Sequence, residues 1–510
     1  MKKRNNWIEK AYQFLVCILP AVLFFSYYPL MHFGSDAAMN YEISLPIIWL
    51  LMFDVLAFVM MVRKKKLFCN WEKKWPWVLL PVWLSLSVLW SMNSVRGLLT
   101  VGILWLIYFA GDAMFELRDV LKKNGFKELF WKMFFGSALF VCGWCLVQCV
   151  LDLAGVSRDY SLMCEGCTYT MFGFPRVNGF AAEPQFMGNL LLAPAIVAGY
   201  FYLKKQKSKN LKLKRSRGVF FTTAKSDSAP YCSTGSSSVA AVKTTSGSRF
   251  LCSKFLLLCF FVFTTTLFLT MSRGAIYAFV VAMVVMTIVM VVRSKKARAL
   301  VVWPVVIVAF LFALNLQGIM AQVSKTDDTY VSGVSKVINQ LSLGVIDLGK
   351  TNSEVEPIES DVGSEASEKA HFDGYVEVST DMRVGLSEAA LQIWSQDFKT
   401  IVAGVGLGGA TNALSENDKA PTTKEIVNNE YVSLLLETGV VGIALLILTL
   451  VLVGRVVMKS QNRAMITTLI LAYGVSLLFF SGLPNALHIY LLPAMILVAE
   501  NLPKSLKNTC

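Results

Sequence analysis

The chain has 510 residues, of which 55% are hydrophobic and only 16% are charged. A soluble protein of this length would be closer to one quarter charged, so the composition argues against a water-soluble globular enzyme. The formal net charge is +14, but basic residues that bind nucleic acid gather on a folded surface, whereas here they flank apolar blocks. No nucleic-acid partner is therefore expected.

Apolar residues are concentrated in twelve blocks along the chain. A membrane-spanning helix needs about 20 apolar residues, since the hydrocarbon core is about 30 Å thick, and in lipid a helix satisfies its own backbone hydrogen bonds. The blocks lie at residues 11–31, 43–62, 75–91, 95–114, 129–151, 186–203, 255–271, 274–292, 299–318, 431–453, 464–483 and 485–500. The expected fold class is all-α, a polytopic membrane protein of about twelve transmembrane helices.

Lysine and arginine residues predict the orientation of these helices, because cytoplasmic segments of membrane proteins are enriched in both. With the N-terminus inside, 36 of the 48 basic residues fall in cytoplasmic segments. Apart from the long loop before the tenth helix, only Arg96, Arg158, Arg176 and Arg273 are expected to lie outside. We therefore expect a multi-pass protein with both termini in the cytoplasm.

Two long polar segments divide the chain. A membrane domain at 1–318 is expected to hold helices 1–9, and helices 10–12 follow at 431–510. The cytoplasmic insertion 204–254 begins with a lysine-rich run and becomes rich in Ser, Thr, Gly and Ala. Such a composition cannot bury a core, so it predicts disorder.

The external loop 319–430 has the opposite charge, with 18 acidic and 8 basic residues. Its acidic, serine-rich middle at 351–369 is expected to be mobile. Residues 381–400 are expected to form an amphipathic helix, because apolar residues recur there at helical spacing. These residues are Met382, Leu386, Ala389, Ala390, Ile393 and Trp394. A glycine turn follows at 404–409, and we expect helix and turn together to form a cap over a site.

Cysteine and histidine residues do not predict a metal site. The histidines, His32, His371 and His488, are scattered, and the external pair Cys164 and Cys167 lacks the second half of a zinc site. That pair is compatible with a disulfide or with two thiols. No metal and no other cofactor is expected.

Polar and charged residues gather at the outer ends of several helices, where ionisable side chains are costly and usually face a cavity or a partner. They are Arg176, Glu183, Arg273, Arg383, Asn428, Asn429 and Glu430. Arginine offers a planar fork to phosphate, so the arginines favour recognition of a lipid-linked phosphate outside the membrane. Two alternatives remain open: Arg273 as an interfacial residue that extends its charge to water, and Arg176 paired with Glu183 without a chemical role.

Five segments of the chain carry motifs that occur together in one family. They are 89–97, 176–184, 270–274, 381–408 and 428–442. Together they resemble the O-antigen ligase and O-antigen polymerase family of bacterial envelope proteins, and the long external loop before the final helices is also similar. The resemblance implies a glycosyltransferase C-like fold in the bacterial cytoplasmic membrane and glycosyl transfer at its external face.

The resemblance also implies substrates and roles. The donor would be a glycan on undecaprenyl pyrophosphate and the acceptor a second glycan, with the lipid bilayer and other polysaccharide-assembly membrane proteins as further partners. Arginines would neutralise the leaving pyrophosphate without a metal. Expected substrate-binding residues are Arg176, Arg273, Glu183 and Asn428, and expected catalytic residues are Arg383, Asn429 and Glu430.

One position departs from the family pattern. Family ligases carry His-Asn where this chain has Asn428-Asn429. Asparagine cannot accept a proton near neutral pH, so Glu430 is the expected base. The departure favours polymerisation of repeat units into O-antigen, capsule or exopolysaccharide. Ligase-type transfer to a surface acceptor and a flippase for lipid-linked sugars remain the alternatives.

Overall fold

The computed structural model describes residues 5–33, 41–67, 71–122, 125–154, 176–220, 252–294, 297–323, 330–342, 346, 375–416, 427–482 and 485–501. Each of the twelve predicted blocks contains a helix. The corresponding helices are α1 (Asn5–Val22), α2 (Leu45–Arg63), α3 (Trp71–Ser87), α4 (Ser94–Glu116), α6 (Phe126–Leu153), α7 (Pro184–Phe220), α8 (Ser253–Leu269), α9 (Arg273–Ser294), α10 (Val302–Val323), α16 (Glu430–Met458), α17 (Arg463–Ser476) and α18 (Leu487–Asn501). The predicted all-α polytopic membrane protein is confirmed.

The number of spans is set by length and hydropathy. Within the described part of the chain, eight helices are long and apolar enough to cross a membrane, and α8, α17 and α18 are apolar but shorter. Helix α3 contains Pro76 and Pro81. Twelve membrane crossings therefore stay a prediction.

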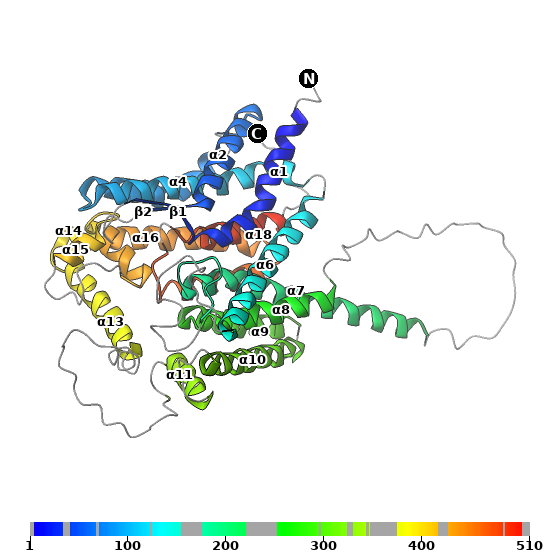
Figure 1. Ribbon diagram of the computed structural model, residues 1–510. Coiled ribbons are helices and arrows are strands. Elements are labelled where there is room, and N and C mark those ends of the chain that lie inside the picture. The colour runs from blue at the N-terminus through cyan, green and yellow to red at the C-terminus, as the bar shows by residue number, and fades with distance from the viewer. Residues whose placement is uncertain are drawn as a thin grey trace, which may run out of the picture.

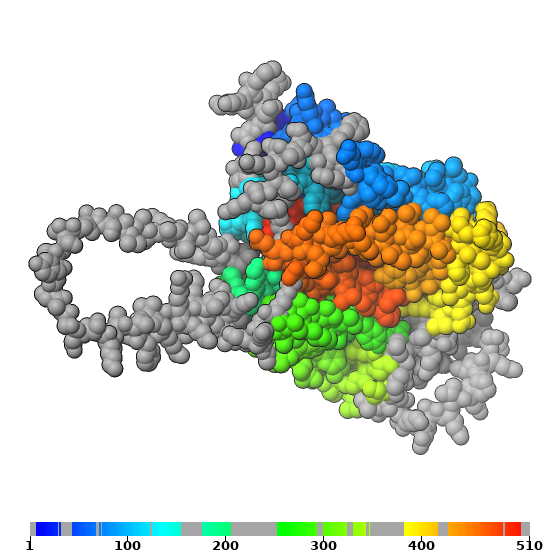
Figure 2. Space-filling view, turned by 180° about the vertical axis from the view of Figure 1, so that it is seen from behind, coloured from blue at the N-terminus to red at the C-terminus, as the bar shows by residue number. Residues whose placement is uncertain are grey.

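Helix α7 is the centre of the bundle, with 94% of its apolar window buried, and it packs against α8, α9 and α17. Helix α16 is the least buried of the eight, with only 11% of its apolar window buried. Figure 2 shows it in orange across the outside of the molecule. Its exposed side chains include Val440, Ile447 and Leu450. An exposed apolar face of this extent fits contact with lipid.

Two boundaries differ from the prediction. The first block, expected as a helix over 11–31, ends its α-helix at Val22, and β1 (Pro29–Phe33) then pairs antiparallel with β2 (Tyr41–Ser44). Proline at position 29 explains the change, since it disfavours helical backbone in the residue before it. Helix α7 continues to Phe220, so the first part of the insertion 204–254 is helical rather than disordered. Its Lys, Leu and Arg are good helix formers.

The segment 319–430, predicted to be an external loop, contains α11 (Tyr330–Ser342), α13 (Tyr375–Trp394), α14 (Phe398–Ala403) and α15 (Ala410–Ser415). Leu386, Ala389, Ala390 and Ile393 are buried in a small core of this region, which confirms the predicted apolar face. Figure 1 places α13, α14 and α15 at one end of the bundle, opposite the end from which α7 extends. The acidic stretch 351–369, His371 and the pair Cys164 and Cys167 lie outside the described residues.

The helix expected over 381–400 is two helices. The break falls at Asp397, whose side chain accepts a hydrogen bond from the Thr400 N–H at 2.8 Å, while the Thr400 hydroxyl accepts one from the Asp397 N–H at 3.4 Å. Such a capping box starts a new helix. The break turns the chain, so that α14 leads directly into the glycine turn.

A buried polar network joins helices at the end predicted to be cytoplasmic. The Glu500 carboxylate accepts hydrogen bonds from Trp131 Nε1 at 2.9 Å and Asn462 Nδ2 at 2.6 Å, and it pairs with Lys127 at 2.7 Å. Asn462 Oδ1 in turn accepts from Lys204 Nζ at 2.7 Å. The network connects α6, α7, α18 and the start of α17, so these helices are tied together at this end of the bundle.

Removing the Glu500 carboxylate should therefore destabilise the protein. Its side chain is 6% exposed, whereas that of Lys127 is 57% exposed. Glu500→Ala would leave the buried Trp131 and Asn462 donors unpaired, and we expect the free energy of unfolding to fall by about 2–4 kcal/mol. Lys127→Ala removes an exposed partner and should cost less than about 1 kcal/mol. Thermal unfolding in detergent checks this order, and equal losses for the two variants would contradict it.

Candidate functional site

The glycine turn at 404–409 is held between two helices. Gly404, Gly406 and Gly408 have φ values of 71°, 92° and 84°, a conformation that favours glycine. A Cβ at Gly406 would lie 2.4 Å from Ser91 Cα, and one at Gly404 would lie 2.3 Å from the Glu437 carbonyl carbon. The glycines let the turn approach the start of α4 and the first half of α16.

Helix α16 supplies the hydrogen bonds that hold this turn. The helix is interrupted at Gly439, which has φ 65° and ψ −170°. The interruption frees carbonyl groups in the preceding turn. The Val405 N–H donates to the Leu436 carbonyl and the Gly406 N–H donates to the Glu437 carbonyl, both at 2.9 Å. The turn is thus fixed against a membrane helix and brings Gly408 and Ala410 to a pocket.

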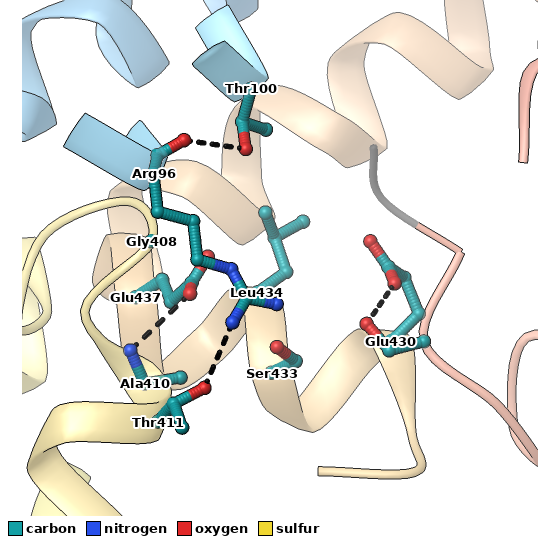
Figure 3. Close-up of a pocket in the computed structure, with 10 residues that line it drawn as sticks. Arg96, Thr100, Gly408, Ala410, Thr411, Glu430, Ser433, Leu434 and Glu437 are labelled. Carbon is teal, nitrogen blue, oxygen red and sulfur yellow. Dashed lines mark hydrogen bonds between the residues drawn. The ribbon is translucent and has the colours of Figure 1, made fainter. Parts of the chain in front are cut away.

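Figure 3 shows this pocket, which has a volume of about 440 Å³ including its mouth. Arg96 lies in the first turn of α4, and its Nη1 donates a hydrogen bond to Thr411 Oγ1 at 3.2 Å. Glu437 Oε1 accepts from the Ala410 N–H at 3.4 Å. The charge of Arg96 acts on the Glu437 carboxylate, and Figure 3 shows both groups directed into the same space.

Glu430 lines the same pocket from the first turn of α16. Its Oε2 accepts hydrogen bonds from Ser481 Oγ at 2.9 Å and from the Gly482 N–H at 2.6 Å, and the residue is 7% exposed. Hydrogen bonds to an ionised acceptor are stronger than neutral ones, and the N-terminus of a helix stabilises a negative charge. The structure therefore holds a carboxylate in a fixed position at the pocket wall.

The two asparagines before Glu430 occupy the start of α16. Asn429 is the N-cap, and its Oδ1 accepts hydrogen bonds from the Tyr431 N–H at 3.0 Å and the Val432 N–H at 3.3 Å. This use of the side-chain oxygen leaves only the amide NH₂ of Asn429 to face a sugar. Asn428 is partly exposed beside it.

Arg176 and Arg273 meet at the turn between α8 and α9. Arg176 is 5% exposed, and its guanidinium donates to the Thr270 carbonyl at 2.9 Å and the Met271 carbonyl at 3.4 Å. Arg273, the first residue of α9, is 8% exposed. Arg176 thus binds the end of α8, where a cation is favoured, and fixes the turn that carries Arg273.

This arginine turn, residues 270–274, lies beside the segment that holds Glu430. A Cβ at Gly274 would lie 2.6 Å from the Cβ of Phe479, which is two residues before Ser481 in the chain. The structure therefore brings three of the predicted residues, Arg176, Arg273 and Glu430, into one region. Glu183 precedes α7, and its carbonyl accepts from the Phe186 N–H at 3.1 Å.

Of the seven predicted site residues only Glu430 lines the pocket, and two charged residues of the pocket, Arg96 and Glu437, were absent from the predicted site. Arg383 is on α13, partly buried, and does not line the pocket. Arg96 and Glu437 do line it. Both carried a signal: Arg96 is one of the few basic residues predicted to lie outside, and Glu437 is a charge within an apolar block. Neither signal showed that the two residues would meet.

Part of the chain matches a known family. Residues 258–447 match the family model described as O-antigen ligase. The match includes Arg273, the glycine turn, Glu430 and Glu437, and it confirms the predicted resemblance to that family. It supports an O-antigen ligase- or polymerase-type function, with lipid-linked glycans as substrates. No curated protein matched the chain.

Proposed function

We propose that the protein is a glycosyltransferase that polymerises lipid-pyrophosphate-linked oligosaccharide repeat units at the external face of the bacterial cytoplasmic membrane. The observation that carries this proposal is the position of Glu430. Its buried carboxylate lines the pocket, and Ser481 and Gly482, which hold it, belong to a segment that packs against the arginine turn. A base placed between an anion-binding turn and a polar pocket suits transfer of a sugar from a pyrophosphate to a hydroxyl.

The chemistry needs no metal in this proposal. Glu430 accepts the proton of the acceptor hydroxyl, while the oxygen of that hydroxyl bonds to the anomeric carbon of the donor sugar and forms the new glycosidic bond. The bond between the donor sugar and the pyrophosphate breaks, and its electron pair leaves on the phosphate oxygen. Arg273 at the N-terminus of α9 stabilises that charge, since guanidinium and helix N-terminus both favour phosphate. Arg176 holds the arginine turn in place, while Glu183, Asn428 and the Asn429 amide orient the sugars.

Two other functions compete with polymerisation. The matched family model is described as a ligase, which favours ligase-type transfer to a surface acceptor as the second candidate. Asn428 in place of the family's histidine favours the polymerase. A flippase needs a path through the midplane, and the Glu500 network that ties α6 and α18 together at the opposite end supports transfer rather than transport.

The test is the size profile of surface polysaccharide in a strain that lacks the protein, together with its lipid-linked glycan pool. A polymerase predicts loss of the long ladder, with single repeat units left on lipid or anchor. Full-length polymer stranded on the lipid carrier would mean a ligase. Single units trapped on the cytoplasmic leaflet would overturn both transfer functions.

Arg383 lies on α13, outside the pocket, and we propose that it reaches the pyrophosphate of a bound donor from the cap formed by α13 and the glycine turn. Losing one charge-assisted hydrogen bond to phosphate costs about 1.5–3 kcal/mol, so Arg383→Ala should lower polymer yield by roughly tenfold to a hundredfold. Lys399→Ala, which removes an exposed basic residue from α14, is the matched control and should leave the yield unchanged. A normal ladder in the Arg383 variant, at normal protein level, would remove Arg383 from the site.

A further inference from the structure

We infer that the pocket formed by Arg96, Thr411 and Glu437 binds the acceptor sugar, while the pyrophosphate of the donor binds at the arginine turn. This inference rests on the proposed function and assigns its two substrates to two places. It also names Arg96 and Glu437 as specificity-determining residues for the acceptor.

The charges that line the pocket favour a neutral polyol over a phosphate. One cation, Arg96, faces two carboxylates, Glu430 and Glu437. Both carboxylates would repel a pyrophosphate, and repulsion between charges grows as water is excluded. The arginine turn instead presents two buried guanidinium groups beside a helix N-terminus. The anion is therefore favoured at the turn and disfavoured in the pocket.

The donors and acceptors of the pocket match the hydroxyl groups of a sugar. Thr411 is paired with Arg96 Nη1, and the planar guanidinium carries five N–H donors in all. Glu437 offers acceptor lone pairs next to those donors, and Ser433, one turn earlier on α16, also lines the pocket. A vicinal diol can accept from the guanidinium and donate to a carboxylate at the same time.

The location of Glu430 relates the acceptor pocket to the arginine turn. Glu430 lines the same pocket as Arg96, so a sugar bound there would place a hydroxyl beside the base. The segment 477–482 links this pocket to the arginine turn, because a Cβ at Gly274 would meet Phe479 and Ser481 donates a hydrogen bond to Glu430. The two binding places are therefore neighbours.

The position of Arg96 near the N-terminus of α4 is not favoured by the electrostatics of the helix. It is the third residue of α4, and the Asn93 side chain caps that helix by accepting from the Arg96 N–H at 3.1 Å. A cation in the first turn of a helix is disfavoured by the helix dipole. Its charge is instead held by Thr411 and Glu437, on the wall of the pocket.

The test measures binding of two separate probes to the purified full-length protein in nanodiscs. One probe is the free repeat-unit oligosaccharide, released by mild acid from the lipid-linked pool of the deletion strain. The other is undecaprenyl pyrophosphate without sugar. Arg96→Ala should weaken oligosaccharide binding by tenfold or more and leave undecaprenyl pyrophosphate binding unchanged. Arg273→Ala should do the reverse.

Further variants separate binding from folding. Thr411→Val keeps the shape of the side chain but removes the acceptor of Arg96, and Glu437→Gln keeps the shape but removes a charge. Both should weaken only the oligosaccharide. Arg455→Ala, which removes an exposed arginine from the far end of α16, is the control and should change neither probe.

Three outcomes would overturn the inference or its premise. If Arg96→Ala weakens undecaprenyl pyrophosphate and spares the oligosaccharide, Arg96 is a phosphate ligand and the assignment is wrong. If the wild-type protein binds undecaprenyl pyrophosphate but no oligosaccharide at millimolar concentration, the acceptor pocket is refuted while the proposed function stands. If it binds neither probe, the proposed function itself fails.

Discussion

Glu430→Gln is expected to lower the rate of polymer formation by about 10²–10⁴-fold, the usual contribution of a general base. Glutamine has nearly the same shape as glutamate, and its amide oxygen can still accept from the Ser481 hydroxyl and the Gly482 N–H that hold Glu430 in place. The fold of the pocket should therefore survive, while the group that accepts the proton is lost. The polysaccharide ladder and the protein level, both measured in the complemented deletion strain, check this result.

Two companion variants make the Glu430 test specific. Glu388→Gln makes the same chemical change at an exposed position of α13 and should leave the ladder normal. Ser481→Ala removes one of the hydrogen bonds that position Glu430, so it should reduce polymer by less than Glu430→Gln does. A normal ladder in the Glu430 variant would show that the carboxylate is structural and that another group, or no base, serves the reaction.

Gly406→Ala is expected to reduce polymer by more than about 100-fold, because the added methyl group would collide with the backbone of Ser91. The residue has φ 92°, and the added Cβ would lie 2.4 Å from Ser91 Cα and 2.6 Å from the Ser91 N. A non-glycine residue in such a conformation costs of order 1–3 kcal/mol before any clash, and the clash here is with backbone, which cannot move aside cheaply. The glycine turn should leave its place and take Gly408 and Ala410 away from the pocket.

Loss of activity and release of the turn should occur together in this variant. Limited proteolysis of membrane vesicles is expected to cut the 375–416 segment faster than in the wild type. The control is Gly102→Ala on α4, where an added Cβ meets no heavy atom within 4 Å and alanine favours the helix. Wild-type polymer from Gly406→Ala would mean that the turn tolerates displacement and that its contact with α4 does not shape the site.

Local patterns in the sequence predicted the elements well and their ends less well. Every apolar block contains a helix, because the hydrocarbon core demands length and internal hydrogen bonding. The apolar face of the loop helix is buried at Leu386, Ala389 and Ile393 as expected. The break at Asp397 was missed because hydrophobic periodicity does not register a cap, although the spacing of Asp397 and Thr400 is a capping signal.

The site could be predicted only in part, because its assembly depends on contacts between distant segments. The positions of Glu430 and Arg273 at helix ends could be predicted from the apolar blocks, because each residue borders one. The meeting of Arg96 with Thr411, which are 315 positions apart, depends on how the glycine turn packs against α4. No periodicity or charge pattern encodes such a contact. Arg383 was predicted from its sequence neighbourhood, yet the path of α13 keeps it out of the pocket.

The interruption of α16 at Gly439 has a consequence for hybrid proteins. Carbonyl groups freed there bind the glycine turn, and a Cβ at Gly439 would lie 2.2 Å from the Val402 carbonyl oxygen. Residues 398–416 and helix α16 must therefore be exchanged together when a hybrid protein is made. A chimera that takes 398–416 from one relative and α16 from another would mismatch this joint, whereas a crossover beyond Gly442 would carry the turn and its partner together.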